Sequence, residues 1–134
     1  MAADEKVIPI AADADIVIAR QEGRALAAKV GFSSSEQIFI ATAISEAARN
    51  ILQYAGKGEI ILEHLEGGSR EGIQIVARDH GPGIKDITRA MEDGYSSSGG
   101  LGLGLPGIKR LMSEMHITST PGNGTTLTIR KWKP

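Results

Sequence analysis

The sequence Arg78-Asp-His-Gly-Pro-Gly-Ile84, followed after a short spacer by Gly94-Tyr-Ser-Ser-Ser-Gly-Gly-Leu-Gly-Leu-Gly-Leu-Pro-Gly-Ile-Lys109, organises this chain. Eight of the 17 glycines lie between Gly81 and Gly107. Glycine has an entropic cost on folding, so this density indicates a backbone that comes close to a ligand. Pro106 suits a first helical turn, and the apolar residues around it have helical spacing: Leu105, Ile108, Leu111, Met112 and Met115. A glycine-rich loop that enters a helix N-terminus offers free N–H groups and a positive dipole end, which favour phosphate.

Three kinds of phosphate-binding loop match these glycines in part. A P-loop requires a lysine directly after its last glycine, but Ile108 follows Gly107 and no apolar strand leads into the segment. The dinucleotide pattern Gly-x-Gly-x-x-Gly matches Gly102 to Gly107, yet it lacks a preceding strand and an acidic residue beyond Glu114 for a ribose. An NAD-linked oxidoreductase is therefore a weak alternative. The third kind joins Asp-x-Gly-x-Gly at Asp79 to a glycine-rich lid and a helix, and it needs further parts elsewhere in the chain.

Composition narrows the class of protein. The chain has 134 residues, 41% of them hydrophobic, which predicts a single domain over residues 1–134. A formal net charge of −1 gives no support for nucleic-acid binding through a basic face. The absence of cysteine excludes disulfides and cysteine-bound metal, and it fits a reducing cytoplasm. No apolar run approaches the roughly 20 residues of a membrane span, so we expect a cytoplasmic protein without membrane or nucleic-acid partners.

The rest of the sequence predicts a series of helices and strands. Asp13 or Asp15 caps a first helix, and Ser33 with Glu36 forms a capping box at the start of a second. The predicted helices cover residues 13–30, 34–54 and the segment after Pro106, with short helical turns at 86–92. The predicted strands cover residues 6–10, 59–65, 72–78, 117–119 and 125–132. This order predicts an α/β fold of the α+β two-layer type: a mixed, mostly antiparallel sheet with helices on one face.

The helix over residues 34–54 carries polar side chains beside its apolar stripe. Thr42, Glu46, Asn50 and Tyr54 follow one another at four-residue spacing and so share one helix face. The helix thus buries one side and holds a carboxylate and a carboxamide one turn apart at its exposed margin. Alone, such a pair is more typical of a solvated helix face. Together with the glycine motifs, and with Asp79 at the end of a strand, it indicates a functional site.

Four motifs occur in order: Glu46-Ala-Ala-Arg-Asn50, Asp79-His-Gly-Pro-Gly83, Gly99-Gly-Leu-Gly-Leu-Gly104 and Gly122-Asn-Gly-Thr125. They resemble the N-box, G1, G2 and G3 boxes of the GHKL family of ATPases and kinases, which includes gyrase and the histidine kinases. The resemblance implies the Bergerat-type ATP-binding fold. The short chain, without a phosphoacceptor-histidine helix or a transducer domain, is most similar to the small bacterial serine kinases of partner-switching sigma-factor pathways. Among these it resembles the stressosome switch kinases most, and the anti-sigma-factor kinases are the nearest rival.

The resemblance implies a serine/threonine protein kinase that uses ATP and Mg²⁺ and phosphorylates a STAS-domain protein. In such a site Asp79 accepts a hydrogen bond from the exocyclic amine of adenine, Gly81 and Gly83 let the chain close over the base, and Thr125 also reaches the adenine. Asn50 offers an amide oxygen to Mg²⁺, and Glu46, one turn earlier, accepts the proton of the attacking hydroxyl. The N–H cradle for the phosphates comes from Gly99, Gly100, Leu101, Gly102, Leu103 and Gly104.

One departure concerns positive charge, because no Lys or Arg lies between Gly94 and Ile108. A cation at the γ-phosphate then comes from Lys109, Arg110, Arg49 or a partner. The resemblance also implies an alternative function: a nucleotide-gated module that binds and sequesters a sigma factor or a phosphatase regulatory domain. A kinase requires Glu46, whereas a sequestering module requires only the nucleotide and a binding surface.

Overall fold

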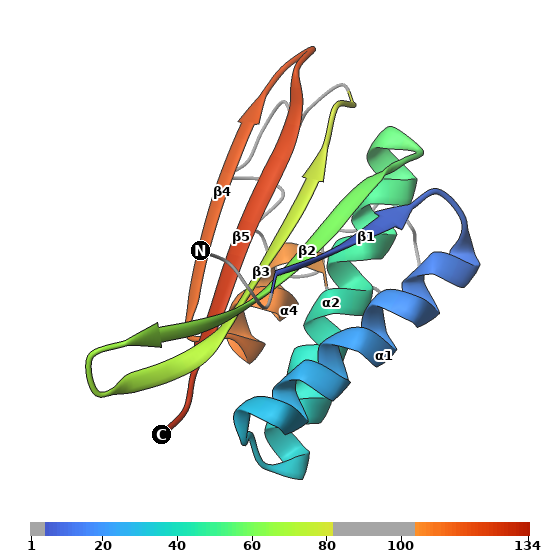
Figure 1. Ribbon diagram of the computed structural model, residues 1–134. Coiled ribbons are helices and arrows are strands. Elements are labelled where there is room, and N and C mark those ends of the chain that lie inside the picture. The colour runs from blue at the N-terminus through green and yellow to red at the C-terminus, as the bar shows by residue number, and fades with distance from the viewer. Residues whose placement is uncertain (1–4, 82–103) are drawn as a thin grey trace.

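A single antiparallel sheet carries the helices on one face (Figure 1). The computed structural model describes residues 5–81 and 104–134. Its elements are β1 Lys6–Ile10, α1 Asp13–Val30, α2 Ser34–Ala55, β2 Gly58–Gly67, β3 Arg70–Asp79, α4 Gly104–Leu111, β4 Glu114–Thr120 and β5 Gly124–Trp132. The described strands form one sheet in the order β1-β2-β3-β5-β4, and every pair of neighbours is antiparallel. The two-layer α+β architecture is confirmed, with an antiparallel sheet where the sequence predicted a mixed one. The helical turns predicted at 86–92 lie outside the described residues.

The core lies between the sheet and the helices. Alternate strand residues point into it because successive side chains of a strand face opposite sides. Its largest fully buried side chains come from all layers: Ile10, Ile40, Ile44, Ile60, Leu62, Ile73, Ile75, Ile108 and Ile129. Each buried aliphatic side chain contributes about 1.5–3 kcal/mol relative to an exposed one. Glycine also matters here, because a Cβ on Gly23 of α1 would lie 2.1 Å from Cδ1 of Ile44. The small residue lets α1 pack closely against α2.

The ends of α2 follow the prediction closely. The Glu36 N–H donates to the Ser33 hydroxyl (3.2 Å) while the Ser33 N–H donates to the Glu36 carboxylate (3.3 Å), so the capping box is confirmed. Gly56, with φ of +80°, ends the helix in the left-handed conformation. At α1 the N-cap residue is Ala12 and not Asp13 or Asp15, although Asp15 does take part in capping through its side chain. Asp15 lies inside the first turn, where its carboxylate accepts hydrogen bonds from the N–H groups of Ala11 (2.8 Å) and Ala12 (3.0 Å).

The helix after the glycine-rich segment is shorter than its apolar pattern suggested. α4 ends at Leu111, and Met115 lies in β4, so placing Met115 on the helix was wrong. Ser113 explains the break: its N–H donates to the Arg130 carbonyl (2.8 Å), and its hydroxyl accepts from the Trp132 N–H (3.1 Å). These bonds to β5 start the strand pairing at the point where the helix stops.

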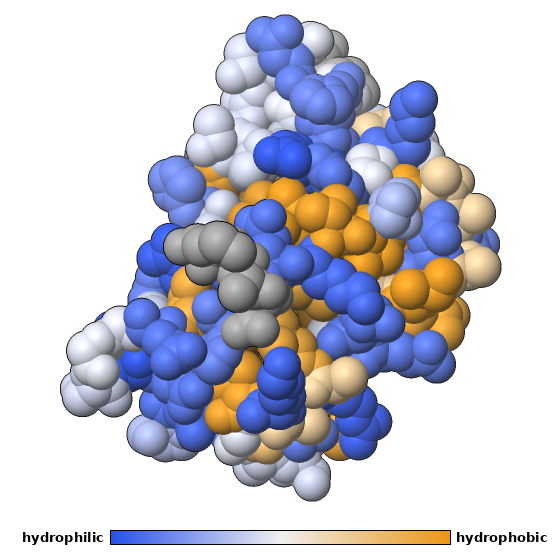
Figure 2. All heavy atoms as spheres, viewed as in Figure 1, coloured by the Kyte–Doolittle hydropathy of each residue, from blue (hydrophilic) through white to orange (hydrophobic). Residues whose placement is uncertain are grey.

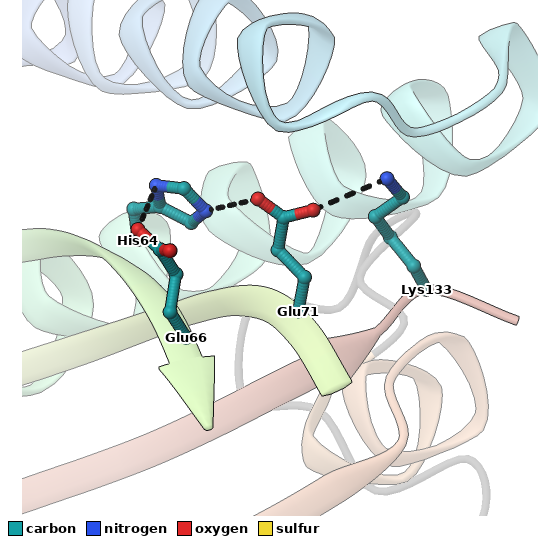
Figure 3. A network of polar contacts seen from close by, with 4 residues as sticks. All are labelled: His64, Glu66, Glu71 and Lys133. Carbon is teal, nitrogen blue, oxygen red and sulfur yellow. Dashed lines mark hydrogen bonds and ion pairs between the residues drawn. The ribbon is translucent and has the colours of Figure 1, made fainter. Parts of the chain in front are cut away.

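The β2–β3 hairpin and the residues after β5 are joined by a polar cluster, shown in Figure 3. Nε2 of His64 lies 2.8 Å from one carboxylate oxygen of Glu71, and Nζ of Lys133 lies 3.3 Å from the other. His64 also faces Glu66 across 3.7 Å. The histidine and the lysine lower the pKa of Glu71 below its ordinary value, the hydrogen bond from His64 being the larger cause. The cluster therefore fastens the C-terminal residues to the hairpin.

Some hydrophobic side chains remain at the surface. Figure 2 shows them over β1 and the first half of α1, where Val7, Val17 and Ile18 are 40–49% exposed. Exposed apolar residues of this number are common in folded proteins. Among the residues that the structure describes, no helix is both long and apolar enough to span a membrane.

Candidate functional site

Asp79 ends the central strand β3 and is almost fully buried, at 8% exposure. Its Oδ1 accepts a hydrogen bond from the Gly81 N–H (2.8 Å) and another from the Thr125 N–H (3.3 Å). The described residues provide no donor for Oδ2, and none of their fully buried side-chain oxygens is left unsatisfied. Oδ2 is therefore the oxygen of this carboxylate that is available to accept a hydrogen bond from a ligand donor.

Three glycines allow the backbone to pack tightly around this carboxylate. A Cβ on Gly124, whose φ is +97°, would lie 2.2 Å from the Asp79 carbonyl oxygen. Gly58 pairs with Asp79 across the β2–β3 ladder, and a Cβ there would lie 2.4 Å from the Arg78 carbonyl. A Cβ on Gly81 would lie 2.5 Å from the Cβ of Ala55. The end of β3 is thus enclosed by β2, the β4–β5 turn and the C-terminal turn of α2.

Thr125 lies at the site through both its backbone and its side chain. Its backbone N–H supports Asp79, and its hydroxyl lies 2.9 Å from the Ser119 hydroxyl on the neighbouring strand β4. Sequence reasoning missed Ser119 and the steric role of Gly124. The available signal was the tight turn at 121–124, which sets Ser119 opposite Thr125 in the hairpin register.

Glu46 and Asn50 lie one turn apart on α2, as their spacing predicted. The prediction that Glu46 lies on an exposed margin was wrong, since it is 8% exposed. α4 packs against α2, which adds cover that the sequence pattern of α2 alone does not reveal. A carboxylate oxygen of Glu46 lies 2.5 Å from Nη1 of Arg49. Asn50 is half-buried.

α2 links the two parts of the candidate site. Ala55 contacts the position of Gly81, and Ile51 contacts the position of Gly58 beside Asp79. Asn50 precedes Ala55 by five residues, or about 7.5 Å along the helix axis. Asp79 therefore lies beside the C-terminal end of α2, the end of the helix that also carries Asn50. A depression of about 320 Å³ adjoins this end, with Ala55, Gly58 and His80 among the residues that line it.

The remaining predicted site residues are placed only in part. Gly83, Gly99, Gly100, Leu101, Gly102 and Leu103 lie outside the described residues. Gly104 is the first residue of α4 and has φ of +63°. Lys109 and Arg110 are exposed in the last turn of α4. Within residues 5–81 and 104–134, no cluster of three or more His, Asp or Glu side chains is suited to a metal ion.

The fold and these positions can be compared with known proteins. The model of the histidine kinase-like ATPase domain family matches residues 10–131, nearly the whole chain. The chain belongs to this family. The sensor histidine kinase MprB, a mycobacterial protein, has the same fold, with a TM-score of 0.56 over 96% of this chain and 97% of that one. The sequence identity of that pair is 15%, so the likeness concerns the fold alone.

Two curated relatives are more informative about function. The serine/threonine-protein kinase RsbT of Bacillus subtilis (strain 168) is 51% identical over 129 residues, covering 96% of this chain and 97% of the relative. An anti-sigma F factor of Thermoanaerobacter sp. (strain X514) is 32% identical over 120 residues, covering 85% and 82%. The chain therefore spans most of the length of both relatives, and its similarity to the kinase is the greater of the two.

Proposed function

We propose that this chain is a switch kinase that transfers the γ-phosphoryl group of ATP to a serine or threonine of a STAS-domain antagonist protein. Such a kinase acts in the cytoplasm, in a bacterial stress-response or sigma-factor pathway. The observation that carries the proposal is 51% identity to a serine/threonine-protein kinase over nearly the full length of both chains. Membership of the ATPase domain family supports the use of ATP.

The surroundings of Asp79 fit adenine recognition. Backbone N–H groups hold Oδ1, so the carboxylate has a fixed orientation and presents Oδ2 as an acceptor. The exocyclic amine of adenine is a donor suited to this oxygen, whereas the corresponding group of guanine is an acceptor. Gly81 and Gly124 admit the close backbone packing that holds the carboxylate, and we infer that Gly83 extends this arrangement. Thr125 contributes by supporting Asp79 through its N–H.

The polar face of α2 fits the phosphate side of the same site. Asn50 offers an amide oxygen to Mg²⁺, which binds few protein ligands and keeps waters and phosphate oxygens as the others. Glu46 accepts the proton of the partner's attacking hydroxyl. ATP supplies the transferred phosphoryl group, and the protein's contribution is mainly position and charge. We assign the N–H cradle to residues 99–104, which precede and open α4.

A second function is favoured by a specific observation. Anti-sigma F factors are related to this chain at 32% identity, over 85% of its length. A nucleotide-gated module that sequesters a sigma factor or a phosphatase regulatory domain would use the same Asp79 and Asn50. It would not need Glu46 as a base. The two functions are therefore separated by phosphate transfer and not by nucleotide binding.

The deciding experiment mixes the purified chain with candidate STAS-domain proteins, Mg²⁺ and labelled ATP. We expect label on one partner, at a serine or threonine that mass spectrometry identifies, and no label when Mg²⁺ is removed. Glu46→Gln should abolish most of this transfer. If a partner binds in an ATP-dependent manner and is never labelled, the sequestering function replaces the kinase.

A further inference from the structure

Arg49 forms an ion pair with the carboxylate that the proposed mechanism uses as a base. Nη1 of Arg49 lies 2.5 Å from Oε2 of Glu46. The arginine side chain is 48% exposed, whereas the glutamate side chain is 10% exposed. An exposed ion pair on a helix contributes little to stability, about 0–1 kcal/mol. Here one partner is buried, so the pair also limits the directions in which the carboxylate can point.

The helix itself makes this arrangement rigid. The two residues are three apart on α2, which places them on neighbouring turns of one face. Both ends of α2 are capped, and the apolar residues around Glu46 are among the most buried: Ala43, Ile44, Ala47 and Ala48 are at most 1% exposed. Motion of the backbone at Glu46 is thereby restricted, so the direction of the carboxylate depends on the contacts of its side chain. The guanidinium of Arg49 is one of these contacts.

We infer that Arg49 is a positioning residue for phosphoryl transfer: it holds the Glu46 carboxylate in the orientation that receives the proton of the partner's hydroxyl. This inference rests on the proposed kinase function. A different role for Arg49 would be to act directly as the cation at the γ-phosphate. The sequence leaves that role open, because no Lys or Arg lies between Gly94 and Ile108. A positioning residue acts through Glu46, so its effect must vanish once Glu46 can no longer act as a base.

A double-mutant cycle tests this dependence with the full chain, Mg²⁺-ATP and the STAS partner. The rate of phosphate transfer at saturating ATP is measured for wild type, Arg49→Ala, Glu46→Gln and the double variant. We expect Arg49→Ala to lower the rate about 10- to 100-fold, which is less than the roughly 10²–10⁴-fold effect of losing the general base itself. The double variant should match Glu46→Gln within about twofold. If Arg49→Ala costs the same factor in both backgrounds, Arg49 acts independently of Glu46 and the inference is overturned.

Conservative variants separate orientation from folding. Arg49→Lys should recover part of the lost rate, because the lysine ammonium can still pair with the carboxylate. Recovery should be incomplete, because lysine lacks the planar two-donor geometry of the guanidinium. Guanidinium ion at low millimolar concentration should raise the rate of Arg49→Ala and leave wild type unchanged. Lys6→Ala is the control, because it also removes the cation of an ion pair. Lys6 pairs with Glu22 (2.7 Å) on the exposed surface, and neither residue belongs to the candidate site. The transfer rate of Lys6→Ala should equal that of wild type.

A spectroscopic measurement makes the inference testable without any partner protein. In ¹⁵N spectra of the arginine side chains, the pair should slow rotation of the Arg49 guanidinium in wild type, and Glu46→Gln should release it. Equal, fast rotation in both proteins would overturn the positioning role.

The kinase proposal fails on a different result, namely transfer of phosphate by Glu46→Gln at the wild-type rate. If Glu46→Gln is inactive and Arg49→Ala is as fast as wild type, the kinase proposal stands and the positioning role is rejected.

Discussion

The backbone N–H of Thr125 donates a hydrogen bond to a carboxylate oxygen of Asp79, 46 residues earlier in the sequence. This bond joins the β4–β5 turn to the end of the central strand. Together with the bond from Gly81, it fixes one oxygen of the carboxylate and leaves the other available to a ligand. The carboxylate is thus oriented before any ligand arrives.

Asp79→Asn tests the adenine assignment. Asparagine keeps an oxygen for the N–H groups of Gly81 and Thr125, so the fold should persist. The amide nitrogen that replaces Oδ2 is a donor and cannot accept a bond from adenine. We expect ATP affinity to fall about 10- to 100-fold, the value of a hydrogen bond to a charged group. Calorimetry with ATP and GTP measures this, and equal affinity of the wild type for both nucleotides would reject the assignment.

Asn50→Ala and Glu46→Gln should have different consequences. Asn50→Ala removes the proposed Mg²⁺ ligand, so both ATP affinity and phosphate transfer should decline. Glu46→Gln preserves the shape of the side chain while removing its charge, so ATP affinity should change little. Transfer should fall by about 10²–10⁴, as for loss of a general base. The two quantities are measured on the same preparations, and a Glu46→Gln protein with weakened ATP binding would argue against this division of roles.

Gly124→Ala tests whether the close approach of the turn to Asp79 matters. Its Cβ would overlap the Asp79 carbonyl oxygen at 2.2 Å, and its φ of +97° is unfavourable for alanine. Gly122→Ala is the control, because φ is +85° there but no atom lies within 4 Å of the added Cβ. We expect Gly124→Ala to be less stable than the control by about 1–3 kcal/mol, the usual cost of overpacking. Urea unfolding measures the difference, and equal midpoints would exclude the steric argument.

Glu71 should make stability depend on pH in the acid range. Its folded-state pKa is lowered by His64 and then by Lys133, so its stabilising contribution is present above the unfolded pKa. The contribution is lost as the pH falls below about 4.5, the ordinary value for this group. Glu71→Gln should therefore lower the urea midpoint at pH 6 and make little difference near pH 3. Glu66→Gln, on the same hairpin but 74% exposed and 3.7 Å from His64, serves as the control with a smaller effect. A constant difference between Glu71→Gln and wild type at both pH values would contradict the linkage.

Local signals in the sequence predicted the elements well. β1 has the predicted bounds, and the start of α2 follows from Ser33 and Glu36, because caps and alternation act over a few residues. The polar face of α2 also follows from four-residue spacing. The burial of Asp79 and Glu46, and the contact of the end of β3 with the C-terminal turn of α2, are structural findings, while the roles of these residues remain predictions.

What the sequence could not provide depends on contacts between distant segments. α4 packs against α2, and the end of α4 is set by bonds from Ser113 to β5. Ser119 joins the site only through the register of the β4–β5 hairpin. A sequence pattern within a single helix or strand does not predict any of these features.

The place of β5 in the sheet has a kinetic consequence. β5 follows β4 in sequence but lies between β3 and β4, so its pairing with β3 joins residues 72–78 to residues 126–132 across a long intervening stretch. Closing such a long loop costs chain entropy before the contacts form, which makes pairing of this kind slow compared with a local hairpin. The hairpin of β2 and β3 presents Asp79 early, but Thr125 reaches it only when β5 docks. During refolding, competence to bind nucleotide should therefore appear when β5 docks against β3 and not when the β2–β3 hairpin forms.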